Sequence, residues 1–482
     1  MPAIAFSHAK IGADKRGCPR VWLEGRRLER SGFLPSARYE VAFDEEKKAI
    51  TLRLAANGER LVSRRSKGEQ EVPVIDLANA RLLASFDGIE TLRVRFEDGR
   101  IVISPTASDL RRADRAARLR QRLKENLPLR SGSVSTGLGV LSLAIHQGLK
   151  SAGIESDLLF SVEIDEKYQD RCAIANPVWR DQTLAVAMPM QEVAFDAAAL
   201  QALPQIEILE AGIPCTAHSI AGRAKKSLAR AEDDPIAGHL IAGFLAITAA
   251  CNPSIVIVEN VPQYEDSASF AILTNQLREW GYDVRSTILR GADFGCIEHR
   301  DRMALVAATP GVDIDLETLA PTEVPDHKLA EYLDEIPLDD PRWSTMSYLR
   351  EKEERDLAAG KGFRMQIFDP GSPKISTITK GYAKVRSTDP KLQHPTDRSL
   401  LRQITPAEHA RIKGVPVDLI AGLPITTAHE MLGQSILVAP FRALGARIGG
   451  AVLAWLHDRP APRGERRQPR IAPLSELPLF AA

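Results

Sequence analysis

Six short segments that read as strands, separated by helical patterns, constrain the fold of this chain more than any other feature. They lie near residues 131–135, 157–163, 206–211, 254–259, 283–290 and 302–308. Strands that alternate with helices form a largely parallel sheet covered by helices. Open sheets of this α/β class bind their ligands beyond the carboxyl ends of the strands. The polar residues that follow these segments are therefore the first candidates for a functional site.

The length of 482 residues is enough for two or three domains. The hydrophobic content of 44% and the charged content of 26% are those of an ordinary globular protein. We predict a β-rich module at 1–105, a basic linker helix at 106–127, an α/β domain at 128–310 completed by 426–457, a small proline-broken domain at 311–425 and a disordered tail at 458–482.

Composition also restricts the location and the partners of the chain. No apolar run approaches the length of a membrane span, and the N-terminus lacks the apolar core of a signal peptide. The five cysteines are odd in number and lack the spacing of disulfide or metal sites. We therefore expect a cytoplasmic protein without a membrane or metal site. Because the formal net charge is +0, any nucleic-acid footprint must be local.

The first 105 residues contain an internal repeat. Residues 21–54 and 74–104 share one order of strand, short helix, alternating strand, acidic turn and last strand. Tyr39 corresponds to Leu92 in this alignment, and the alternation has a period of two. The pattern resembles tandem swapped-hairpin units of the AbrB and SymE type, which form small β-barrels. The resemblance implies either contact with DNA or RNA, or a structural or docking role.

Residues 106–127 read as a basic helix with seven cations spread around it. One interpretation is a solvated linker, and the other is an element that follows phosphates beside an active-site cleft.

A thiol, a carboxylate and two guanidinium groups lie at the ends of predicted strands. Cys215 comes after Pro214, just beyond the segment 206–211, and Glu259 ends the next strand. Arg300 lies just before the last segment, and Arg302 begins it. These groups, brought together at strand ends, are what nucleophilic attack on an electron-poor ring requires.

Several motifs, in the same order along the chain, resemble the cytosine-5 DNA methyltransferase family over about residues 128–457. They are Pro214-Cys215 with Ser219, Glu259-Asn260-Val261, Glu298-His299-Arg300-Asp301-Arg302, the segment 402–416 and the segment 432–449. The resemblance implies a Rossmann-like S-adenosylmethionine-dependent methyltransferase sheet, with a target-recognition region in 311–425. Double-stranded DNA would be the substrate, and 5-methylcytosine the product.

The resemblance also assigns roles to the motif residues. Cys215 would attack carbon 6 of a flipped cytosine, and Glu259 would bind the exocyclic amine and protonate ring nitrogen 3. Arg300 would hold the ring carbonyl. Ser219, Asn260 and Arg302 would contact DNA or order the loops around the base.

The predicted methyl-donor site departs from the family pattern. We expect its residues to be Ser135, Gly137, Gly139, Glu163, Ile164, Pro214, Gln434 and Ser435. The family carries an aromatic residue where Ser135 stands, an acidic residue near Ser133 and Asn where Gln434 stands. S-adenosylmethionine remains the expected donor. The alternatives are the same covalent chemistry on RNA or with a non-methyl donor, and a DNA-binding regulator without catalysis.

The tail carries one more motif. Glu476 to Phe480 resemble the short segment with which bacterial proteins dock on the sliding clamp, with Leu477, Leu479 and Phe480 as its apolar anchors. A packed or free tail without a partner is the alternative.

Overall fold

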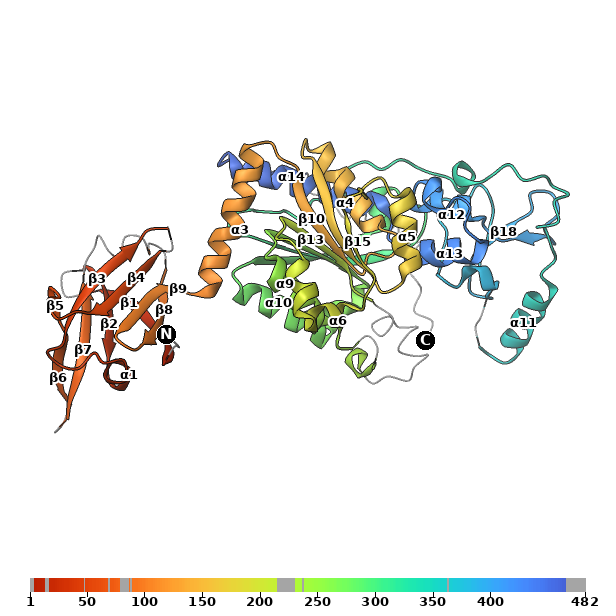
Figure 1. Ribbon diagram of the computed structural model, residues 1–482. Coiled ribbons are helices and arrows are strands. Elements are labelled where there is room, and N and C mark those ends of the chain that lie inside the picture. The colour runs from red at the N-terminus through yellow and green to blue at the C-terminus, as the bar shows by residue number, and fades with distance from the viewer. Residues whose placement is uncertain are drawn as a thin grey trace, which may run out of the picture. The chain divides into compact units, whose positions relative to one another are not determined.

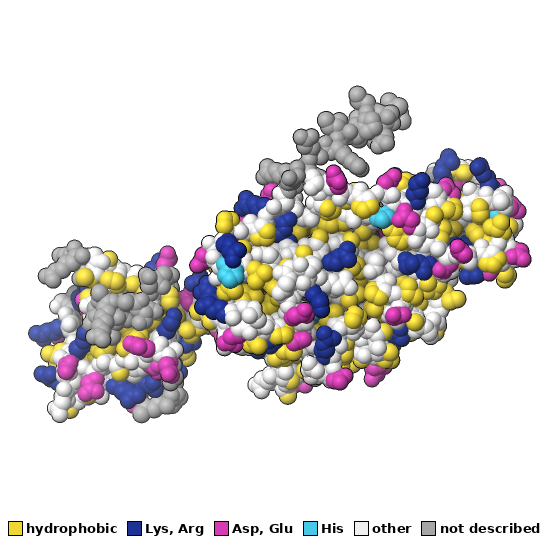
Figure 2. Space-filling model, turned by 90° about the horizontal axis from the view of Figure 1, so that it is seen from above, with side chains coloured by type: hydrophobic (Ala, Val, Ile, Leu, Met, Phe, Trp, Pro, Cys, Tyr) yellow, Lys and Arg dark blue, Asp and Glu magenta, His cyan; other side chains and the backbone are white. Residues whose placement is uncertain are grey.

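The computed structural model describes residues 4–13, 17–46, 48–67, 70–78, 86, 89–214, 230–235, 238–361 and 364–464 (Figure 1). The chain divides into two compact units, Met1–Asp114 and Arg115–Ala482, and each is described here by itself. On the face seen in Figure 2, basic and acidic side chains are interspersed over both units, as the net charge of +0 leads one to expect.

The first unit is a nine-stranded antiparallel sheet that curls into a nearly closed, β-rich structure. Its strands are β1 (Ala5–Ala13), β2 (Pro19–Glu24), β3 (Arg38–Asp44), β4 (Ala49–Leu54), β5 (Arg60–Leu61), β6 (Ser63–Lys67), β7 (Gln70–Ala78), β8 (Thr91–Glu97) and β9 (Arg100–Pro105), with helix α1 (Arg26–Arg30) after β2. Alternate apolar residues such as Ile50, Leu52, Val94 and Phe96 fill its core. The expected β-rich N-terminal module is confirmed.

The pairing of the strands follows the internal repeat. The alignment that equates Tyr39 with Leu92 also equates Ile50 with Ile103, and these two residues lie opposite each other where β4 pairs with β9. The first strands of the two repeats, β2 and β7, also pair antiparallel. The first and the last strand of one repeat thus pair with the equivalent strands of the other repeat. The resemblance to swapped-hairpin families stays a prediction.

The second unit is built on a seven-stranded sheet in the order β12-β11-β10-β13-β14-β16-β15. The strands are β10 (Leu129–Val134), β11 (Ser156–Val162), β12 (Leu184–Val186), β13 (Ile208–Gly212), β14 (Ile255–Asn260), β15 (Asp283–Arg290) and β16 (Asp301–Ala308). β10 to β14 are parallel, and β16 runs antiparallel to both of its neighbours. The predicted α/β sheet is confirmed.

Helices cover both faces of this sheet (Figure 1). One core joins the sheet to α4 (Val140–Ser151), α5 (Glu166–Ala175), α13 (Ile425–Gln434) and α14 (Val438–Leu456). The other joins it to α6 (Met190–Phe195), α7 (Ala197–Ala202), α9 (Leu240–Cys251) and α10 (Ala268–Glu279). The C-terminal helix α14 packs along α4, so a segment distant in sequence completes the domain.

Helix α3 (Ala107–Lys124) is bound to the second unit by its arginines. Arg118 and Arg122 reach the fully buried carboxylate of Glu207 at 3.7 and 3.4 Å, and Arg130 reaches it at 2.7 Å. The Arg115 guanidinium lies over the ring of Tyr282, 3.7 Å from its centroid. These arginines hold the helix to the protein, which neither the solvated-linker nor the phosphate-following interpretation anticipated.

The region 311–425 contains a small three-stranded sheet of β17 (Ile367–Phe368), β18 (Lys391–Gln393) and β19 (Leu401–Arg402), with helices α11 (Ser347–Ala358) and α12 (Pro406–Lys413). A separate apolar core supports it. The second unit as a whole also contains short 3-10 helices: η2 (Ala231–Asp233), η3 (Pro262–Asp266), η4 (Gly291–Phe294), η5 (Leu329–Tyr332), η6 (Tyr382–Lys384) and η7 (Val417–Ile420).

Residues 458–464 were assigned to a disordered tail, and the structure corrects this. Arg447 of α14 donates a hydrogen bond to the Pro462 carbonyl at 2.9 Å, and the Gly464 amide donates to Thr318 at 2.6 Å. The chain is therefore fixed on α14 as far as Gly464.

Within the described ranges, no single helix is long and apolar enough to cross a membrane. Only α13 and α14 together reach that length and composition, and they bend by 44° at the break between them.

Candidate functional site

Glu259 and Arg302 form an ion pair at the carboxyl end of β14. Arg302 Nε lies 2.8 Å from Glu259 Oε1, and the two side chains are 15% and 14% exposed. Burial raises the pKa of the Glu259 carboxyl above its ordinary value, and the charges of Arg302 and Arg300 oppose that rise. The pair therefore offers a carboxyl that keeps its proton to a higher pH than usual, beside a guanidinium donor.

Arg300, predicted to hold the ring carbonyl, makes its direct contacts with other groups. Its side chain is 3% exposed, it donates a hydrogen bond to the Gly433 carbonyl at 3.0 Å, and Glu298 lies 3.7 Å from it. Glu298 is itself fully buried and pairs with Lys413 of α12 at 2.9 Å. Arg300 thus belongs to a buried charge cluster between the sheet and α12, while Arg302 is the arginine that contacts Glu259.

The side chain of Asn260, expected to contact DNA or to order the loops around the base, is buried. Its Nδ2 donates to the Ile213 carbonyl at 3.2 Å, and its Oδ1 accepts from the Val261 amide at 2.9 Å. Asn260 therefore fixes the backbone that leads into Pro214. Pro214 is exposed and is the last described residue of that segment, so the predicted nucleophile Cys215 and Ser219 lie outside the described residues.

Gly212, at the end of β13, separates Glu259 from the glycine loop at 135–139. A Cβ added to Gly212 would lie 3.5 Å from Glu259 Oε2 and 3.6 Å from the Ser135 carbonyl oxygen. The carboxyl and the loop therefore face the same small space, and sequence reasoning had not singled out this glycine.

The glycine loop has an unusual backbone, which its residues allow. Ser135, Gly137 and Gly139 have φ values of 54°, 53° and 69°. Glu163 Oε2 accepts the Gly137 amide at 2.8 Å, and Asn176 Nδ2 donates to the Gly139 carbonyl at 3.1 Å. The loop is thus held from β11 and α5. A Cβ on Gly137 would meet nothing within 4 Å, so the side of the loop at this residue is open.

The other expected donor-binding residues lie on neighbouring elements. Ile164 follows Glu163 and is 67% exposed. Gln434 donates a hydrogen bond to the Tyr168 hydroxyl, and the Ser435 hydroxyl donates to the Met431 carbonyl at 2.8 Å.

These residues fit S-adenosylmethionine, the donor that the resemblance implies. Glu163 can accept further hydrogen bonds from ribose hydroxyls, because each carboxylate oxygen has more than one acceptor site. Ile164 offers an exposed apolar surface for an adenine ring, and the loop is open at Gly137.

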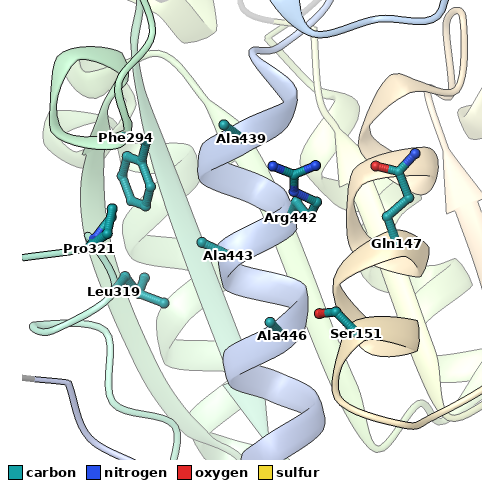
Figure 3. Close-up of a pocket in the computed structure, with 9 residues that line it drawn as sticks. All are labelled: Gln147, Ser151, Phe294, Leu319, Pro321, Ala439, Arg442, Ala443 and Ala446. Carbon is teal, nitrogen blue, oxygen red and sulfur yellow. The ribbon is translucent and has the colours of Figure 1, made fainter. Parts of the chain in front are cut away.

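A groove of about 670 Å³ runs along α14, with α4 on one side and Phe294, Leu319 and Pro321 on the other (Figure 3). Ala439, Ala443 and Ala446 line it from α14, and Gln147 lines it from α4. None of the described candidate site residues lines this groove, and we assign it no part in the site.

Two polar residues near the site were missed from the sequence. Glu210 is a charged residue within an otherwise apolar strand, which is the signal that could have found it. Lys413 had no such signal. A lysine at a helix C-terminus is common and usually exposed, so its burial could not be predicted from the sequence.

Comparisons with known proteins agree with the fold and the motif order. The family described as C-5 cytosine-specific DNA methylase matches residues 136–450. The chain is 30% identical over 318 residues to the Type II methyltransferase M.NlaX of Neisseria lactamica, covering 64% of this chain and 94% of that protein. It is 26% identical over 309 residues to the DNA-cytosine methyltransferase of Escherichia coli K12, covering 55% and 65%.

Solved structures agree at the level of the fold alone. The Dnmt2 methyltransferase of S. pombe aligns with a TM-score of 0.52 and 20% identity, over 66% of this chain and 97% of its own. The methyltransferase EhMeth of Entamoeba histolytica aligns with a TM-score of 0.50 and 19% identity, over 69% and 98%.

Proposed function

We propose that this chain, which belongs to the C-5 cytosine-specific DNA methylase family and is a DNA cytosine-5 methyltransferase, methylates a flipped cytosine held by Glu259 and Arg302. One observation carries this proposal. Gly212, which has no side chain, lies between the Glu259 carboxyl of this ion pair and the Ser135 carbonyl of the glycine loop. A base at the pair would have its reacting edge next to a donor on that loop.

Cys215 is the proposed nucleophile. Its thiolate adds to carbon 6 of the cytosine, a carbon–sulfur bond forms, and the electron pair of the 5,6 double bond moves toward carbon 5. Glu259 supports this step by giving its proton to ring nitrogen 3, which draws electrons from carbon 6. After transfer, a water molecule takes the carbon 5 proton, the Cys215 sulfur leaves as thiolate, and the proton on ring nitrogen 3 returns to Glu259, which restores the aromatic ring.

Arg302 is the proposed partner of the ring carbonyl. Its guanidinium lies at hydrogen-bond distance from Glu259, so a base that meets the Glu259 carboxyl also comes within reach of Arg302. Two neighbouring groups that bind opposite sides of one ring edge orient the base for attack.

S-adenosylmethionine is the proposed donor and supplies an electrophilic methyl group when bound. The loop with Ser135, Gly137 and Gly139 would receive its sulfonium end, and Glu163 and Ile164 would hold the ribose and the adenine. Gln434 is the last residue of α13 and Ser435 follows it, and these two residues would close the site. A non-methyl donor on the same loop remains the alternative.

Double-stranded DNA is the proposed substrate, and the named sequence relatives support it. RNA has no support among them, and a regulator without catalysis does not accord with the family. Because M.NlaX is named a Type II methyltransferase, we also propose that this chain protects DNA within a restriction–modification pair.

Mass spectrometry of nucleosides tests the reaction. DNA from cells that express the wild-type chain should contain 5-methylcytosine, and DNA from cells that express Cys215→Ala at the same level should not. A new nucleoside of another mass that depends on Cys215 would mean that the donor supplies a group other than methyl. Equal 5-methylcytosine in both samples would overturn the assignment of Cys215.

A further inference from the structure

Glu210 places a carboxyl group inside the sheet, on the face covered by α4. It lies in the middle of β13 with no exposed surface. In the register of the sheet its neighbours are Ser133 of β10 on one side and Ile257 of β14 on the other. A carboxyl at such a position is costly unless its polar atoms find partners.

Two serine hydroxyls partner this carboxyl. Ser142 of α4 donates a hydrogen bond to Glu210 Oε1, and a hydrogen bond with Ser133 also contributes. Oε2 has no hydrogen-bond partner among the described residues. Burial raises the pKa of Glu210 to about 7, against the pull of the two serines. The environment therefore keeps the neutral acid populated up to about pH 7, where an ordinary carboxyl is ionised.

Among the described residues, no cation offsets an ionised Glu210 from the elements packed against it. β10 presents Ser133, β14 presents Ile257, and α4 presents Ser142. One turn further along α4, His146 is hydrogen-bonded to Ser131, and burial lowers its pKa to about 4, so it is neutral as well.

The two serines stand at opposite ends of the glycine loop. Ser133 precedes Ser135 on β10, and Ser142 lies in the first turn of α4, just after Gly139. Glu163 and Asn176 hold the middle of the loop from β11 and α5. Glu210 is thus the group that connects the strand entering the loop with the helix leaving it.

We propose that Glu210 is a positioning residue for the methyl donor, which, as a neutral acid, fixes the spacing of β10 and α4 and thereby the shape of the loop 135–139. This inference rests on the proposed function, because it requires the loop to bind the donor. Ionisation of Glu210 would place an uncompensated charge between β10 and α4 and distort the loop. Donor binding is therefore coupled to retention of one proton.

The sign of the coupling follows from the raised pKa of Glu210. Below about pH 7 the free protein already holds the proton, so binding does not depend on pH. Above that value each further pH unit weakens binding by up to about tenfold, since the bound form must recover the proton. From pH 6 to pH 8 the loss is about tenfold in all.

Calorimetry with S-adenosylhomocysteine tests this coupling without any turnover. The full-length wild type is compared with Glu210→Gln, which keeps the shape and cannot ionise, and with Glu210→Ile, which removes the hydrogen bonds. Ile208→Val, on the same face of β13, controls for lost stability, and the melting temperature of each variant is recorded.

The affinity of the wild type for S-adenosylhomocysteine should fall about tenfold between pH 6 and pH 8. Glu210→Gln should bind as the wild type does at pH 6 and stay constant to pH 8. Glu210→Ile should bind about tenfold more weakly than Ile208→Val at every pH.

Equal pH dependence in the wild type and Glu210→Gln would overturn the inference, as would equal affinities of Glu210→Ile and Ile208→Val. Failure of the wild type to bind S-adenosylhomocysteine at millimolar concentration would overturn the donor assignment and this inference with it. If the wild type binds S-adenosylhomocysteine tightly but either of these two equalities is found, only the inference about Glu210 is overturned and the donor assignment stands.

Discussion

Arg302 Nε lies 2.8 Å from the Glu259 carboxylate, whereas Arg300, two residues earlier, is turned to the Gly433 carbonyl and to Glu298. The two arginines of one motif therefore do different work. Arg302 contacts the proposed catalytic carboxyl, and Arg300 contacts a buried carbonyl and a buried carboxylate.

Substitution of these arginines should separate activity from stability. We expect Arg302→Ala to lower kcat by about a hundredfold or more, because it removes a donor at the reacting base, with little change in melting temperature. Arg300→Ala should instead destabilise the fold by about 3–5 kcal/mol, because it breaks a buried charge cluster. Single-turnover rates and urea unfolding measure the two effects. A stable Arg300→Ala with the larger loss of rate would reverse the assignment.

Glu259 should make the protein less stable as the pH rises. Because the pKa of the folded carboxyl lies above its unfolded value, the folded state holds the extra proton between the two values. The stability linked to this proton is fully present below the unfolded value of about 4.5 and is lost as the pH rises through the folded pKa.

Glu259→Gln removes this proton and tests the sign. As the pH is raised from acid to alkaline, we expect the unfolding free energy of Glu259→Gln to increase relative to that of the wild type. Methylation should be lost at every pH. Urea unfolding at several pH values measures the difference. A difference that shrinks with rising pH would mean that the carboxyl is stabilised in its charged form.

The extent to which the sequence predicted this architecture depended on the length of each element. β11, β13 and β14 are mainly apolar runs that end near polar residues, so their existence and their common edge were predictable. β12 was missed because Leu184–Val186 is only three residues long and is mostly exposed. The single antiparallel strand, β16, was not predictable, since hydrophobic runs carry no direction.

The site could be predicted by residue type but not by orientation. Nothing in the spacing of Arg300 and Arg302 says which one faces Glu259. In the structure, Glu298 pairs with Ile375 of the region 311–425 in an isolated β-bridge, and the Arg300 side chain reaches the Gly433 carbonyl. Tertiary contacts of this kind leave no trace in the local pattern.

Gly212 should tolerate only a small side chain. Gly212→Ala adds a Cβ at ordinary contact distances of 3.5 and 3.6 Å, so it should fold and retain most of its activity. Gly212→Val should fill the space between Glu259 and the loop and reduce the methylation rate by about a hundredfold, as small misplacements of reacting groups do. Methylation rates and melting temperatures of both variants check this. Equal rates would mean that the reacting groups do not meet across this glycine.

The tail motif should bind a sliding clamp if its resemblance is functional. Leu477, Leu479 and Phe480 lie outside the described residues, and docking through them is a proposal. We expect purified clamp to retain the full-length protein and to lose it when residues 474–482 are removed. Leu477→Ala together with Phe480→Ala gives a matched control of unchanged length. Equal recovery of all three proteins would leave the tail without this partner.

Two deletions should distinguish the N-terminal module from helix α3. Removal of residues 1–105 leaves α3 in place, so the melting temperature of the second unit should be unchanged. Removal of residues 1–124 also takes Arg118 and Arg122 from the buried Glu207, which should cost about 3–5 kcal/mol.

The shorter deletion also decides between the two roles open to the module. If the module contacts DNA, the protein without residues 1–105 should bind duplex DNA more weakly and with less sequence preference, while Cys215-dependent methylation persists. Titration of labelled duplexes at two salt concentrations measures this, because lost phosphate contacts reduce the salt dependence of binding. Unchanged affinity, preference and salt dependence would exclude DNA contact and leave the module a structural or docking role.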